Sequence, residues 1–141
     1  MISALVYDVG HVERYTIEDD ADLTAAREAS GTTWIRVSSP TEAEIAAVSD
    51  AFSLHALEIE DVRGGVRPKT EAFDDHTFVL ITTAALERGE TTFDEEIRTQ
   101  PIGLFLGDDW LVTITDEDER VPVVSDVWQS VENQQGRILK Q

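Results

Sequence analysis

Apolar positions in the first part of the chain follow strand spacing and helix spacing in turn. Residues 2–7 and 12–17 are rich in β-forming side chains and flank Gly10, which predicts a pair of strands joined by a turn. Residues 22–29 predict a short helix. Residues 33–38 alternate between apolar and polar side chains, so they predict a further strand.

The next segment has the signals of a helix start. Residues 39–42, Ser-Pro-Thr-Glu, match a capping box with proline at the first helical position. Ile45, Val48 and Phe52 follow at helical spacing. These three side chains are therefore expected to form one buried stripe.

A second helix is predicted directly afterwards, over residues 55–63. Its apolar side chains are Leu57, Ile59 and Val62. The glycine pair at 64–65 is expected to end it, because glycine is a poor helix former.

The second half of the chain predicts mostly strands. Residues 77–81 are almost continuously apolar, which is typical of a central strand buried on both faces. Residues 96–100 are another candidate strand. Segments 102–106 and 110–115 predict a hairpin around the Gly-Asp-Asp turn at 107–109.

The last predicted element is a helix that begins near Pro122. Its apolar stripe consists of Val123, Val124, Val127 and Val131. Strands and helices are thus intermixed along the chain, with hairpins among them. This order predicts a mixed β-sheet covered by helices, an α/β fold of the αβα-sandwich type, with α+β as the alternative.

Composition is that of a globular protein, with 41% hydrophobic residues among 141. This length suffices for one core, so a single domain over residues 1–141 is expected. No apolar run approaches the roughly 18–20 residues that span a bilayer, and the N-terminus lacks the features of a signal peptide. Without cysteine the chain has no disulfide and no thiolate metal site.

Charge changes the picture most. Asp and Glu number 29 against 11 basic residues, for a net charge of -18, and only Lys69 and Lys140 are lysines. Such a chain should repel nucleic acid and anionic membrane surfaces. The acids are spread along the whole sequence, whereas a cation site would cluster them and an acidic tail would gather them at one end. A diffusely acidic, lysine-poor surface predicts a halophilic protein.

Signatures of common enzymes do not occur in this sequence. It has neither common Gly-rich phosphate loop, no Gly-x-Ser-x-Gly elbow and no His-Glu-x-x-His pair. His11, His55 and His76 stand far apart, which argues against a zinc site. A metal-dependent enzyme built on the acids at 58–61 would need a nucleophile or base beside them, and none accompanies them. The chain is therefore not expected to be an enzyme.

Two neighbouring segments carry a resemblance to a known family. Residues 55–62, His-Ala-Leu-Glu-Ile-Glu-Asp-Val, and 67–75, Arg-Pro-Lys-Thr-Glu-Ala-Phe-Asp-Asp, are similar to the N-terminal cytoplasmic domain of the CorA-like magnesium/cobalt transporter family. Trp-Ile at 34–35 precedes them in the family's order, and 104–107 and 110–114 resemble its next hairpin.

The resemblance covers residues 33–138 and includes departures from the family pattern. Ala56 stands where the family usually has proline, and the glycines at 64–65 replace bulkier residues. The first thirty residues match no family segment. The family's two membrane helices and its Gly-Met-Asn signature do not occur in this chain.

By resemblance, Asp61 matches a carboxylate that helps to bind a regulatory divalent ion between neighbouring subunits, with Glu60 beside it. Mg²⁺ prefers oxygen ligands and is commonly held by one or two carboxylates with several waters. The family's partner carboxylate lies on a stalk helix beyond Gln141, so this chain would supply part of a site. The alternative is that both acids simply end a solvated helix.

Other polar residues nearby have structural explanations. His55 is expected to begin the helix, and Asp-Asp-His at 74–76 is expected to form a turn, because aspartate pairs favour turns. Arg67 and Lys69 are expected to offset nearby acids. The three tryptophans are expected in the core or at subunit contacts.

The function implied by the resemblance is metal sensing. The chain would be the cytoplasmic funnel domain of a divalent cation channel on the cytoplasmic side of the cell membrane, attached through C-terminal helices. Mg²⁺ would be both the regulatory and the transported ion, with Co²⁺ as a second cargo. The partners would be neighbouring subunits of a homo-oligomer, a pentamer in this family. The alternatives are transport of zinc or another divalent ion, and a free-standing soluble binding module.

Overall fold

The computed structural model describes residues 1–64, 67–88, 95–116 and 123–133. In these residues seven strands form one sheet in the order β2-β1-β3-β7-β6-β5-β4, with four helices around it. The strands are β1 (Ile2–Asp8), β2 (His11–Thr16), β3 (Thr32–Ser38), β4 (Lys69–Ala72), β5 (Thr77–Arg88), β6 (Glu95–Leu106) and β7 (Trp110–Thr115). The helices are α1 (Asp20–Glu28), α2 (Glu42–Phe52), α3 (Ala56–Arg63) and α4 (Val123–Glu132).

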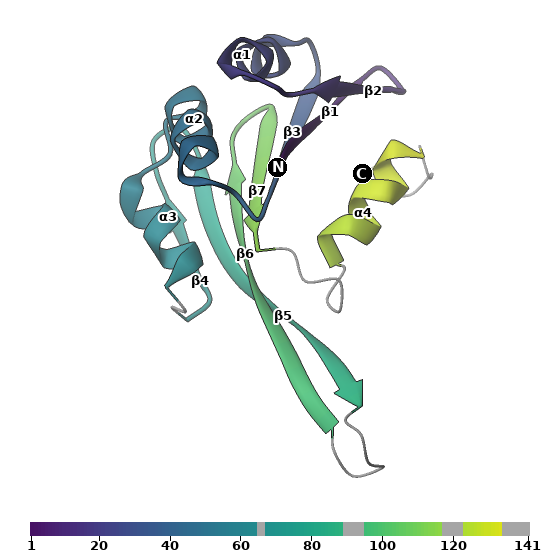
Figure 1. Cartoon of the computed structure of the whole chain (residues 1–141). Coiled ribbons are helices and arrows are strands. Elements are labelled where there is room, and N and C mark those ends of the chain that lie inside the picture. Colours follow the sequence, from purple (N-terminus) through teal and green to yellow (C-terminus); the bar gives the residue numbers. More distant parts are fainter. Residues whose placement is uncertain (65–66, 89–94, 117–122, 134–141) are drawn as a thin grey trace.

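The sheet is mixed because one central pair is parallel. β3 and β7 run in the same direction, whereas the other neighbouring strands are antiparallel. Helices α1, α2 and α3 lie on one face of the sheet and α4 on the other (Figure 1). The predicted α/β fold with helices on both faces is therefore confirmed.

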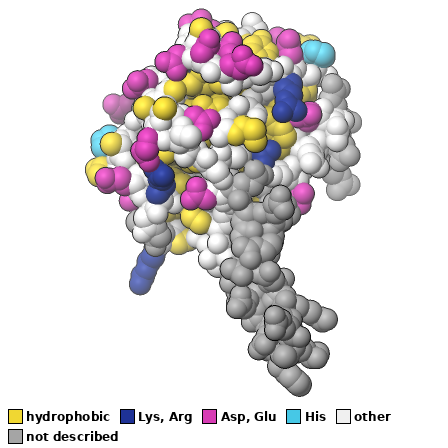
Figure 2. Space-filling model, viewed as in Figure 1, with side chains coloured by type: hydrophobic (Ala, Val, Ile, Leu, Met, Phe, Trp, Pro, Cys, Tyr) yellow, Lys and Arg dark blue, Asp and Glu magenta, His cyan; other side chains and the backbone are white. Residues whose placement is uncertain are grey.

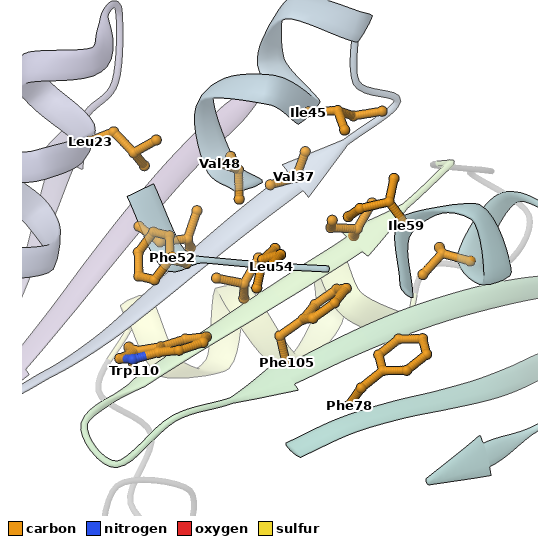
Figure 3. Close-up of a cluster of buried hydrophobic side chains, with 14 of the residues drawn as sticks. Leu23, Val37, Ile45, Val48, Phe52, Leu54, Ile59, Phe78, Phe105 and Trp110 are labelled. Atoms are coloured by element: carbon orange, nitrogen blue, oxygen red, sulfur yellow. The ribbon is translucent and has the colours of Figure 1, made fainter. Parts of the chain in front are cut away.

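The first hydrophobic core fills the space between α1–α3 and the sheet. The predicted stripe of α2 is buried as expected, and Phe52 packs against Trp110 with ring centroids 4.9 Å apart. Phe78 of β5 and Phe105 of β6 stack at 5.0 Å in the same layer (Figure 3). This layer fixes where α2 and α3 lie on the sheet.

The start of α2 differs from the prediction by two residues. Ser39 has a left-handed φ of 42°, which turns the chain out of β3 and is unsuited to an N-cap. Thr41 is extended instead and forms the capping box with Glu44. The pattern at 39–42 therefore did mark a helix start, but the N-cap is Thr41 and not Ser39.

Helix α3 packs closely against β6. Ile59 and Val62 are buried, but Leu57 is 61% exposed and Glu58 is buried in its place. Gly103 allows the close approach, because a Cβ there would overlap the side chain of Val62. Of the three apolar side chains of the predicted helix, Leu57 is thus the one outside the core, and helical spacing alone does not show that a carboxylate has a buried partner.

Strand β5 is second from the edge of the sheet and not central. Phe78 and Leu80 face the core, whereas Val79 is half-buried and Ile81 is exposed on the other face. The prediction of burial on both faces was therefore wrong, because α4 packs against β2 and β3 at the other end of the sheet. β6 is one strand that continues through Pro101, so the separate segments 96–100 and 102–106 belong together.

Within the described residues, α4 is the helix that covers the second face of the sheet (Figure 1). Trp128 lies edge-on to Trp34 of β3, with ring centroids 4.9 Å apart. The four valines of α4 face the sheet across an apolar groove of about 650 Å³. Val123 and Val127 remain partly exposed, so the predicted stripe is only half-covered. Pro122 lies outside the described residues.

Candidate metal site on α3

His55 fixes the start of α3. Its Nδ1 accepts a hydrogen bond of 3.2 Å from the backbone N–H of Leu57, and Glu58 accepts one of 2.9 Å from the backbone N–H of His55. These reciprocal bonds form a capping box. The predicted helix-start role of His55 is confirmed, and α3 begins regularly although Ala56 stands where proline is usual.

Glu58 also holds a buried histidine. His76 Nε2 lies 2.9 and 3.0 Å from the two carboxylate oxygens of Glu58, and both side chains are 2% exposed. The other ring nitrogen, Nδ1, lies 2.7 Å from Asp75 Oδ1. Both ring nitrogens of His76 therefore have a carboxyl partner, one buried and one at the surface.

The sequence did not reveal this cluster. Residues 74–76 do form a turn, since Phe73 N–H donates to His76 O at 2.8 Å. The turn, however, directs the His76 ring into the core, beside Phe73 and Trp110 at 5.2 and 5.9 Å. A helix-capping glutamate at position 58 gave no sign that it had a second, distant partner.

Asp61 lies in the last turn of α3 beside β4. Lys69 Nζ contacts Asp61 Oδ2 and lies 2.5 Å from Glu71 Oε1. Asp61 and Lys69 are 24% and 31% exposed, so the ion pairs lie at the surface without being fully solvated. Hydrogen bonds to Asp61, and then to Glu71, raise the pKa of Lys69 above its usual value. Lys69 thus offsets acids, as predicted.

Glu60 is exposed on α3 and does not share the environment of Asp61. Adjacent residues on a helix point in different directions, so this pair does not form a chelate by itself. Among the described residues, no three His, Cys, Asp or Glu side chains lie close enough together to hold a metal ion. Asp61 and Glu71 suit Mg²⁺ in number and type, but an ammonium group lies between them.

The sequence profile of the CorA-like Mg²⁺ transporter protein family matches residues 29–141, which is most of the chain. The chain belongs to the CorA-like transporter family. The resemblance noted at residues 55–75 is therefore confirmed. CorA-like proteins are transporters, and nothing in the match indicates catalysis.

Known structures share the fold. The soluble domain of CorA from Methanocaldococcus jannaschii matches 99% of this chain with a TM-score of 0.64 at 14% identity. The cytoplasmic domain of ZntB from Vibrio parahaemolyticus matches 95% with a TM-score of 0.66 at 10% identity. In each case this chain spans 50% of the other chain's length.

A short stretch is also similar to a yeast protein. The manganese resistance protein MNR2 of Saccharomyces cerevisiae is 45% identical over 47 residues, which are 33% of this chain and 5% of that protein. In the part of the chain that the structure describes, no helix is both long and apolar enough to cross a bilayer. The family match at residues 29–141 includes α3 and its carboxylates.

Proposed function

We propose that this chain is the cytoplasmic metal-sensing domain of a CorA-type divalent cation channel, in which Mg²⁺ regulates gating. The observation that carries the proposal is the family match across residues 29–141, which includes Asp61 on α3. Asp61 is partly exposed at the end of this helix, where a neighbouring subunit could reach it. Glu60 would add negative charge beside it and stay hydrated.

The proposed mechanism needs a homo-oligomer, a pentamer by resemblance. Asp61 of one copy and a carboxylate of its neighbour would share Mg²⁺ and hold the closed arrangement. Without the ion these like charges repel one another, so the closed state loses stability. The ion shifts the balance only by its difference in affinity for the two arrangements.

The test is Asp61→Asn in the full-length transporter, with flux measured as a function of internal Mg²⁺. The Mg²⁺ concentration for half-closure should rise several-fold, because one oxygen ligand loses its charge. Glu42→Gln is a matched control, since it removes one exposed carboxylate on α2. If Mg²⁺ inhibition in Asp61→Asn equals that of the control, Asp61 has no regulatory role.

A second candidate keeps the fold and changes the cargo. The ZntB cytoplasmic domain has the same architecture, and the manganese resistance protein shares a short similar segment. Co²⁺, Zn²⁺ or Mn²⁺ would then replace Mg²⁺ as the transported ion. Competing-ion flux assays on the full-length protein separate these cargoes from Mg²⁺.

A further inference from the structure

Lys69 is an unusual residue in this chain. Of 11 basic residues only two are lysines, and Lys69 is the one within the described residues. An arginine presents a broad planar fork, whereas a lysine carries a compact, strongly hydrated point charge. Lys69 therefore resembles a small cation more closely than its arginine counterparts do.

The position of this charge is specific. Lys69 extends from β4, and its ammonium group bridges Asp61 of α3 and Glu71 of the same strand. The pKa of Lys69 is raised by these two carboxylates in that order, so the group remains charged through the physiological range. Two carboxylates around one positive charge are also what Mg²⁺ commonly uses in proteins, together with waters.

We infer that Lys69 is a tethered counter-ion that competes with divalent ions for Asp61 and thereby sets the metal concentration to which the domain responds. This inference rests on the proposed regulatory role of Asp61. A tethered ammonium keeps a fixed local concentration, so dilution does not remove it. A divalent ion that displaces it meets two freed carboxylates, and the flexible lysine stem lets the ammonium group move into solvent.

The test is Mn²⁺ binding to the chain, followed by electron paramagnetic resonance, in wild type and Lys69→Met. Removal of the ammonium group should tighten Mn²⁺ binding by up to about fivefold, because the ion no longer has to displace a competing charge. Lys69→Arg keeps a positive charge and should stay nearer to wild type.

Arg63→Met is the matched control. It also removes one positive charge at the end of α3 and frees one carboxylate, since Arg63 Nη1 lies 2.6 Å from Glu42 Oε1. A general increase in negative charge would tighten binding equally in both variants, and that outcome would overturn the inference. Tighter Mn²⁺ binding that persists in the Lys69→Met/Asp61→Asn double variant would overturn the inference as well.

A second measurement uses the wild-type chain, so its result does not depend on whether the variants fold. The ammonium protons of Lys69, followed by their ¹⁵N–H signal, should exchange faster with water as Mg²⁺ is added, since the carboxylates would then bind the ion. Unchanged exchange at saturating Mg²⁺ would also refute the inference. Failure of Asp61→Asn to alter gating would instead refute the regulatory site, and would leave the Lys69 binding result as it is.

Discussion

His76 is held in the core by a carboxylate at each ring nitrogen. Glu58 contacts Nε2 from α3, and Asp75 contacts Nδ1 from the turn before β5. The two carboxylates differ in environment, because Glu58 is buried and Asp75 is 56% exposed. Loss of the contact between His76 and Glu58 therefore leaves a polar group without that partner in the core, whereas Asp75 can turn to water.

Replacement of His76 by leucine should be strongly destabilising. The variant leaves Glu58 buried with only its helix-cap contact, so unfolding free energy should fall by about 3 kcal/mol or more. Asp75→Asn removes the exposed partner and should lower it by less than about 1 kcal/mol. Urea unfolding at constant molar KCl measures both. Equal losses would mean that the Asp75 contact alone accounts for the contribution of His76, and that its contact with Glu58 adds nothing.

At the scale of elements, α2 and α3 each begin with a capping box. Thr41 and Glu44 form the first, and His55 and Glu58 form the second. These boxes satisfy backbone N–H groups that a helix start otherwise leaves unpaired. The glutamates of the two boxes have different surroundings, since Glu44 lies near the surface beside the N-terminus and Glu58 lies in the core.

The capping box formed by Glu44 should stabilise the start of α2 less at acid pH than at neutral pH. The Thr41 backbone N–H donates to Glu44 and, with the N-terminal ammonium group, lowers the pKa of Glu44 below its ordinary value of 4.5. Since the folded pKa is the lower one, this stabilisation is present above about pH 4.5 and disappears as the pH falls through the folded pKa.

Glu44→Gln should therefore be less stable than wild type at neutral pH by about 0.5 kcal/mol, and equally stable in acid. Unfolding curves recorded from neutral pH to about pH 3 test this expectation. A stability difference that stays constant over this range would assign the effect to side-chain shape and not to charge.

Elements were predictable where the information is local. The stripe of Ile45, Val48 and Phe52 follows from helical spacing, and the β1–β2 hairpin follows from a turn between two β-rich runs. Contacts that depend on the arrangement of distant elements were not predictable. Burial of His76 and the bridge from Lys69 to Asp61 both require α3 to lie beside the β4–β5 hairpin.

At the scale of the whole molecule, negative charge is widely distributed. Figure 2 shows acidic side chains scattered over the visible face, with few basic ones among them. The net charge of -18 is spread over many positions, so no single ion pair neutralises it. The apolar groove under α4 lies on a molecule that otherwise repels its own copies.

Stability should therefore rise with KCl through the molar range. Screening shortens the Debye length from about 30 Å at 0.01 M salt to about 3 Å at 1 M, which weakens repulsion between surface carboxylates. Thermal melts from low salt to about 2 M KCl test this, with a neutral osmolyte at equal osmolality as the control. Melting temperatures that do not change with KCl would exclude a halophilic surface.

The parallel pairing of β3 with β7 has a consequence for biosynthesis. β3 is complete at residue 38, but its partner begins only at Trp110. The edge of β3 therefore stays open while the ribosome makes the intervening chain, which at roughly 5–20 residues per second lasts several seconds or more. Open strand edges invite pairing between chains. During that interval the acidic side chains already synthesised would keep nascent chains apart, so the same charge that strains the finished domain in dilute salt would protect it while it is being made.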